Sequence, residues 1–233
     1  MNHFRAPHAR RIVTASLMIG VAFVIFGLSF GVLAVSAGAS VLQACAMSLL
    51  IFTGASQMSA VSVIATGGSA ASAFGGAVLL SGRNAVYGLA MAPVLRGSPF
   101  PARLLGAQWV IDETTAVVSA EADESIRRTA FWISGAILYA SWNLGTLLGA
   151  LLGSSINPSD FGLDVAFPVM FTAMVASHLR TKQGRRAALF GAVAAVALAP
   201  FMPIGLPILI SAFGMLFGLA PQQTPVAESH IEK

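Results

Sequence analysis

The segment from Ile12 to Gly82 carries no Asp, Glu, Lys, Arg or His side chain. A water-soluble domain needs a solvated polar face, so a charge-free segment of this length excludes most soluble folds. As one helix it would be roughly 107 Å long at ~1.5 Å per residue, whereas the hydrocarbon core of a bilayer is about 30 Å thick. The segment is therefore long enough to cross a membrane about three times.

The composition extends this conclusion to the whole chain, which is 56% hydrophobic and only 9% charged. Soluble domains are about 25% charged. The apolar runs are continuous rather than alternating, which indicates spanning helices rather than a barrel of strands. We predict an all-α, polytopic membrane protein embedded in the lipid bilayer, and not an enzyme, because no catalytic motif is present.

The remaining composition argues against several other classes. The net charge of +4 fits positive loops at an anionic membrane face. The basic residues are not interleaved with aromatic residues, so no nucleic-acid partner is expected. A single cysteine, Cys45, excludes an intrachain disulfide and a Cys-x-x-Cys metal site, and no cofactor or metal is predicted. The first apolar stretch is too long for a typical cleaved signal peptide, so we expect it to be retained.

Breaks in the apolar pattern divide the chain into candidate spans. They cover residues 12–35, 41–65, 70–95, 103–121, 129–153 and 163–179. Residues 187–219 form two short apolar pieces split by Pro200–Pro207, so the chain has about eight, possibly seven, transmembrane helices. Residues 1–11 are predicted to be a cytoplasmic N-terminus, and residues 221–233 a disordered tail.

The positive-inside rule tests this order of spans. With the N-terminus in the cytoplasm of a bacterial cell and eight spans, Arg127, Arg128 and the basic segment 180–186 are cytoplasmic. Only Arg96 and Arg103 then face outward.

A weak internal repeat is visible at an offset of about 118 residues, with Gly27–Gly31 resembling Asn143–Leu147. It predicts related three-helix units at 12–95 and 129–219, joined by the linking span 103–121. Chance similarity between glycine-rich helices is the alternative. Gly27, Gly31 and Gly54 are expected to be helix-packing positions.

Ionisable residues near the middle of predicted spans are the best candidates for function, because a charge there costs about 2.5–3.5 kcal/mol. Arg83 is central in 70–95 and can hold a substrate carboxylate with its planar fork. The alternative is a structural ion pair with Asp112 or Glu113. These two carboxylates point about 100° apart on a helix, so one can pair with Arg83 while the other carries a coupling proton. If 103–121 is instead an interfacial helix, both lie in water.

Other polar or aromatic side chains near span centres complete the predicted substrate-binding set. They are Asn84, Tyr87, Gln57, Trp142 and Asn143. Bridging or packing between helices is the alternative role for each of them.

Four segments, in this order, resemble the AzlC family: Gly27–Gly31, Phe52–Gln57, Arg83–Gly88 and Asp112–Thr114. The resemblance implies the large subunit of a bacterial branched-chain amino acid exporter in the inner membrane. It also implies export driven by the proton gradient and a small AzlD-like membrane subunit as partner. The competing interpretations are a channel or pore subunit and a transporter for another small amphipathic solute.

Overall fold

The computed structural model describes residues 6–155, 172, 175–176, 179–202, 206–211 and 213–214. Most of the span predicted at 163–179 and all of the tail predicted at 221–233 lie outside the described residues. The elements within them are helices, which confirms the prediction of an all-helical membrane protein.

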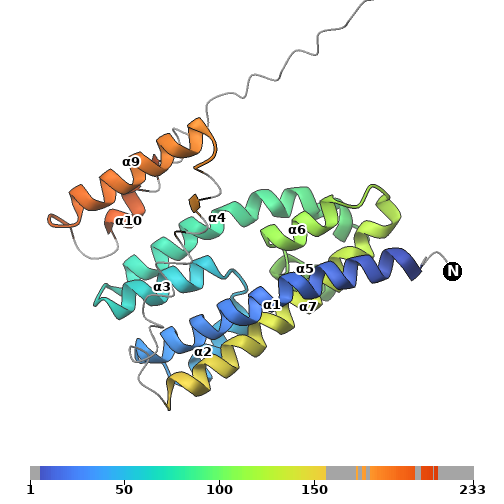
Figure 1. The fold of residues 1–233 in the computed structure, drawn as a ribbon, viewed down its shortest axis with the longest axis horizontal. Coiled ribbons are helices and arrows are strands. Elements are labelled where there is room, and N and C mark those ends of the chain that lie inside the picture. Colours follow the sequence, from blue (N-terminus) through green and yellow to red (C-terminus); the bar gives the residue numbers. More distant parts are fainter. Residues whose placement is uncertain are drawn as a thin grey trace, which may run out of the picture.

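Three long helices form the frame: α1 (Ala6–Ser36), α4 (Ala70–Leu95) and α7 (Glu124–Gly153). Each is apolar and long enough to cross a membrane, and each agrees with a predicted span. α1 and α7 run in the same direction, and α4 runs antiparallel to both of them (Figure 1). We call the end where α1 begins the N-side, and the other end the opposite side.

The segment predicted as one span at 41–65 is instead two helices, α2 (Val41–Leu50) and α3 (Ala55–Ala65). At ~1.5 Å per residue, neither helix is long enough to cross a bilayer. α2 starts at the opposite side, and its last turn reaches only the middle of α7, where the Tyr139 hydroxyl donates a hydrogen bond to the carbonyl oxygen of Leu49 at 2.8 Å.

α3 then returns to the side from which α2 came. The Ser81 hydroxyl on α4 donates to the Ser56 hydroxyl at the start of α3, at 2.9 Å. One turn further along α3, Ser59 faces Gly76 of α4. Since α3 and α4 are antiparallel, α3 ends beside the first turn of α4. The prediction of a single crossing is wrong: α2 and α3 form a re-entrant hairpin with its tip at 51–54.

The segment predicted as one span at 103–121 is likewise two helices, α5 (Phe100–Gln108) and α6 (Asp112–Ser119). α5 starts on the N-side, and its Gly106 lies against Leu95 at the end of α4. α6 ends close to Glu121, whose carboxylate pairs with Arg11 at 2.6 Å on the first part of α1. This second hairpin therefore enters and leaves on the N-side, with its tip at 109–111 (Figure 1).

This topology corrects the predicted placement of two arginines. Arg128 at the start of α7 donates from Nη2 to the Ser98 hydroxyl at 2.9 Å, in the turn between α4 and α5. Arg96 and Arg103 thus lie on the same side as Arg127 and Arg128, because the second hairpin returns instead of crossing.

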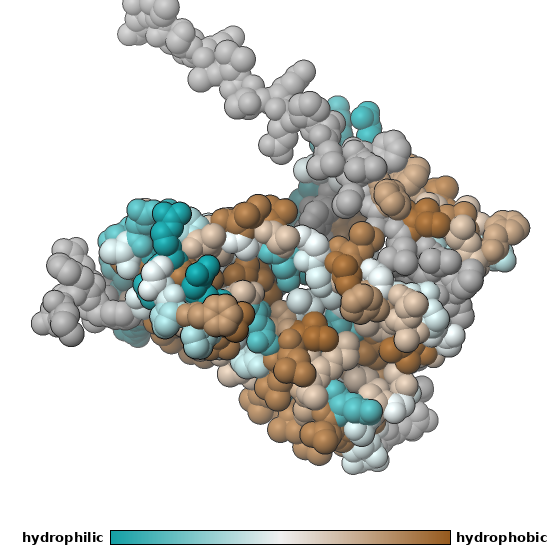
Figure 2. Space-filling view, turned by 180° about the vertical axis from the view of Figure 1, so that it is seen from behind, coloured by the Kyte–Doolittle hydropathy of each residue, from teal (hydrophilic) through white to brown (hydrophobic). Residues whose placement is uncertain are grey.

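Hydrophilic residues gather at this N-side end of the long helices, and apolar residues cover much of the rest of the face seen in Figure 2. The described turns at the opposite side, 37–40, 66–69 and 154–155, contain no charged residue.

The closest helix contact joins α1 to α7 through glycines on both helices. A Cβ at Gly31 would collide with the carbonyl oxygen of Thr146, and a Cβ at Gly149 would collide with that of Leu28. The same reciprocity holds one turn earlier, between Gly27 and Gly145. Small residues at four-residue spacing on both helices allow this approach of the two backbones.

The two short apolar pieces predicted within 187–219 are α9 (Lys182–Leu198) and α10 (Leu206–Ser211). They pack on each other, with Gly191 of α9 facing the carbonyl oxygen of Ser211. Residues 203–205 lie outside the described residues, so the number of crossings within 187–219 stays a prediction. Because each hairpin replaces one predicted crossing, the predicted total of seven or eight spans falls by two.

Cysteine accessibility distinguishes this topology from alternating spans. We expect cysteines at Arg103 and Ser125, in a Cys45→Ala background, to react with an impermeant thiol reagent from the same side of the membrane. A cysteine at Ala70 should react from the other side. Labelling of Arg103→Cys and Ser125→Cys from different sides would restore the single span at 103–121.

The α1–α7 contact predicts opposite effects for one substitution at two glycines. Gly31→Ala should lower the free energy of unfolding by roughly 1–3 kcal/mol, as in overpacked cores. Gly82→Ala is the control, since a Cβ there meets no other atom within 4 Å, and it should raise stability by about 0.5–1 kcal/mol. Thermal unfolding in detergent measures both, and equal effects would contradict the close approach.

Candidate functional site

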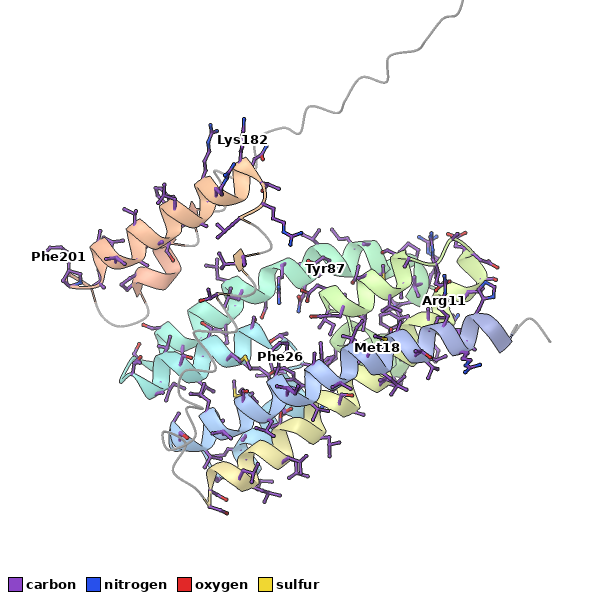
Figure 3. All side chains as sticks on the ribbon, viewed as in Figure 1. Arg11, Met18, Phe26, Tyr87, Lys182 and Phe201 are labelled. Atoms are coloured by element: carbon purple, nitrogen blue, oxygen red, sulfur yellow. The ribbon has the colours of Figure 1, made fainter. Side chains whose placement is uncertain are left out.

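A cavity of about 300 Å³ lies at half the height of the long helices, where the tips of the two hairpins come together. Phe26 on α1 and Tyr87 on α4 line it from two different helices (Figure 3). The complete lining comes from the three long helices and both hairpins: Phe23, Phe26, Phe52, Thr53, Gly54, Ala55, Met58, Arg83, Asn84, Tyr87, Ile111, Asp112, Glu113 and Trp142.

The charged part of the cavity is an ion pair between α4 and α6. Arg83 Nη1 lies 3.4 Å from Asp112 Oδ2, with the two side chains 37% and 36% exposed. Glu113 follows on the next position of α6 and lines the same cavity. The distance is long for a charge-assisted hydrogen bond, and a single guanidinium nitrogen is engaged with Asp112. The remaining donors of Arg83 can therefore serve a ligand.

Two helices begin at the cavity, α3 after Gly54 and α6 with Asp112. The free N–H groups of a helix N-terminus give it a partial positive charge. In α6, Asp112 and Glu113 in the first turn complement that charge. α3 has no acidic residue in its first turn and no side-chain cap. The N–H of Ser56 bonds to the carbonyl oxygen of Thr53 at 3.2 Å, so the N–H of Ala55, which lines the cavity, is the group at this helix start that can bind an anion.

Three polar atoms of lining residues are buried without a hydrogen-bond partner among the described residues. They are the Thr53 hydroxyl, the Asn84 amide oxygen and the Trp142 indole nitrogen. Buried polar groups are normally paired, so their position around a cavity indicates that a polar ligand or water completes them.

The other wall is aromatic and apolar. Phe23 packs against Phe52 with ring centroids 6.2 Å apart, and against Trp142 at 5.9 Å. Met58 and Ile111 continue this surface from the two hairpins. The cavity therefore combines a charged end with an apolar end.

Six of the predicted substrate-binding and proton-coupling residues line this cavity: Arg83, Asn84, Tyr87, Trp142, Asp112 and Glu113. For Arg83 the structure contains the ion pair that was the alternative to carboxylate binding, and Asp112 is its partner. The carboxylates do not lie on one continuous span, because they start the second half of a hairpin.

The other predicted residues have different places. Gln57 is fully buried and donates to the carbonyl oxygen of Met47 at 3.0 Å, so it holds the first hairpin together. Asn143 donates to the carbonyl oxygen of Tyr139 within α7. Gly54, predicted as a helix-packing position, also lines the cavity: it adopts φ 41° at the hairpin tip and faces the Trp142 side chain, not the backbone of another helix.

Sequence reasoning missed the aromatic wall and both hairpin tips. Phenylalanines within an apolar run look like any lipid-facing or core residue, so Phe23, Phe26 and Phe52 carried no signal. The second tip did have a sequence signal, since two adjacent acidic residues such as Asp112 and Glu113 are typical of the first turn of a helix. A helix start at this position is inconsistent with one continuous span over 103–121.

Comparisons with known proteins place the chain in a family. The model of the family described as AzlC protein matches residues 18–156, which include the whole cavity lining. The inner membrane protein YgaZ of Escherichia coli (strain K12) is 28% identical over 78% of this chain and 79% of its own. An uncharacterized membrane protein of Helicobacter pylori (strain J99 / ATCC 700824) is 27% identical over 81% of this chain and 82% of its own.

No solved structure matches. The family match covers more than half of the chain, with helices long enough to span a membrane. The chain therefore belongs to the AzlC family and has a role in membrane transport.

Proposed function

We propose that this protein is a secondary exporter of branched-chain and similar apolar amino acids across the bacterial inner membrane. The observation that carries the proposal is the central cavity, which joins charged groups of both signs to an aromatic wall. Its volume of about 300 Å³ is at the small end of ligand pockets, which suits a single amino acid.

Each part of an amino acid has a matching surface in this cavity. The carboxylate would bind Arg83 and the open N-terminus of α3, because both present N–H donors. The ammonium would bind Glu113 and the unpaired amide oxygen of Asn84. The apolar side chain would lie against the rings of Phe23 and Trp142.

The hairpins supply a route for transport. Broken helices that meet at the midplane are typical of secondary transporters, in which half-helix ends bind the substrate. α2–α3 reaches the cavity from the opposite side and α5–α6 from the N-side, so movement of either hairpin would open the cavity to one side only.

The distribution of arginines supports a cytoplasmic N-side. Arg10, Arg11, Arg96, Arg103, Arg127 and Arg128 all lie there. Positive residues remain in the cytoplasm during insertion, so the N-terminus is proposed to be cytoplasmic.

Two further features belong to the proposal. The reciprocal glycine contacts between parallel α1 and α7 support an internal duplication with units at 12–95 and 129–219. A small AzlD-like subunit is proposed as partner, as the family resemblance implies.

Transport by the purified protein tests the substrate class. In liposomes, with and without a small partner subunit, we expect counterflow of labelled Leu, Val, Ile and Met. Arg83→Lys should reduce counterflow by tenfold or more, because lysine cannot form a two-pronged contact with a carboxylate. Arg103→Lys lies outside the cavity and should leave it unchanged. Failure of all four amino acids to exchange under both conditions would reject the proposed substrates.

Coupling is proposed to depend on Glu113, since Asp112 is held by Arg83. Glu113→Gln should abolish export driven by a proton gradient and keep substrate exchange, because exchange needs no net movement of protons. Asp112→Asn should instead lower the yield of folded protein. The readouts are labelled-leucine export with an imposed pH gradient, counterflow without one, and expression level. Gradient-driven accumulation by Glu113→Gln would exclude Glu113 as the proton carrier.

A further inference from the structure

A second cavity of about 480 Å³ lies on the N-side, away from the central one. It is formed by the end of α4, the end of α6 and the start of α7. The lining is Ala90, Met91, Pro93, Val94, Arg96, Val118, Ser119, Glu124, Ser125, Arg127 and Arg128. None of these residues lines the central cavity.

The rim of this second cavity carries a net positive charge from Arg96, Arg127 and Arg128 against Glu124. Two of the guanidinium groups are fixed by neighbours. Arg127 Nε donates to the carbonyl oxygen of Glu121 at 2.9 Å, and Arg128 Nη2 donates to the Ser98 hydroxyl. The Arg96 side chain makes no hydrogen bond or ion pair in the part of the chain that the structure describes.

The deeper wall of the cavity is apolar. Met91 is 4% exposed and Val118 is fully buried, and the half-buried Val94 and the exposed Ala90 on α4 also line the cavity. From Ala90 to Arg96 the helix rises roughly 9 Å at ~1.5 Å per residue. The cavity therefore changes from apolar to cationic along the direction of the helix axis, towards the N-side end.

We propose that this cavity binds the headgroup of an anionic phospholipid. The phosphate would lie among the arginines at the rim, and the glycerol and first acyl carbons would lie against the apolar wall. Basic pockets between helices at the cytoplasmic face are suited to such headgroups. A free phosphate ester would use the rim alone, and the apolar wall is the reason to prefer a lipid.

A bound headgroup would also connect separate parts of the fold. Arg96 belongs to the turn that leads into the second hairpin, and Arg128 belongs to the long helix α7. A phosphate held by both would fix the base of α5–α6, so binding should raise the temperature of unfolding.

Thermal unfolding in neutral detergent tests the proposal, with phosphatidylglycerol or phosphatidylcholine added at the same concentrations. We expect phosphatidylglycerol to raise the unfolding temperature more, with a half-maximal concentration about fivefold higher for Arg96→Gln. Arg103→Gln is the matched control: this arginine is also exposed on the N-side but lies outside the cavity, and it should behave as wild type. Native mass spectrometry gives a second readout, with fewer phosphatidylglycerol molecules retained by Arg96→Gln than by Arg103→Gln.

Three results would overturn the lipid site. The first is an equal response to the two lipids, and the second is an equal weakening by Arg96→Gln and Arg103→Gln. The third is an equal shift produced by soluble glycerol phosphate at the concentrations of the lipid, which would show that the apolar wall takes no part. None of these readouts depends on transport, so the result is independent of the proposed exporter function.

Discussion

The fold depends on satisfying the backbone groups that become free where its helices break inside an apolar bundle. An unpaired carbonyl or N–H costs several kcal/mol in such surroundings. At the first break, the carbonyl oxygen of Leu49 accepts hydrogen bonds from Tyr139 of α7 and Gln108 of α5. At the second break, the buried hydroxyl of Thr114 accepts from the N–H of Ile111 and donates to the carbonyl oxygen of Trp109 at 2.8 Å.

These bonds also explain why the breaks need a rigid frame. Tyr139 can reach Leu49 only because α7 holds its position beside α2, and α7 is fixed by its close contact with α1. The glycines at 27, 31, 145 and 149 bring these two backbones together. The α1–α7 pair thus holds both hairpins, through these polar contacts and through aromatic packing such as Phe23 against Phe52 and Trp132 against Trp109.

The sequence alone predicted the three long helices with nearly correct bounds, because each is a continuous apolar run between polar turns. It did not predict the first hairpin, because the Tyr139 hydroxyl that bonds to Leu49 is distant in sequence. At the second hairpin the bonding groups are local, since Thr114 lies within five residues of Ile111 and Trp109, and this signal was missed. Nothing local to Gln57 or Leu49 shows that their partners are Met47 and Tyr139. The same error displaced Arg96 and Arg103 to the wrong side. The charged residues of the cavity were predictable because a charge in an apolar segment is costly and therefore indicates a function. Phe23 and Phe52 in the aromatic wall were not predictable, because they resemble the apolar residues around them.

The geometry of the ion pair gives the proposed transport a specific order of events. Arg83 holds Asp112 through one contact of 3.4 Å, which a substrate carboxylate can replace with a two-pronged contact to the same guanidinium. The substrate ammonium would bind Glu113 at the same time, and the Glu113 carboxylate cannot hold that ammonium and a coupling proton together. Substrate and proton would therefore exclude each other at Glu113, which is what export driven by an inward flow of protons requires.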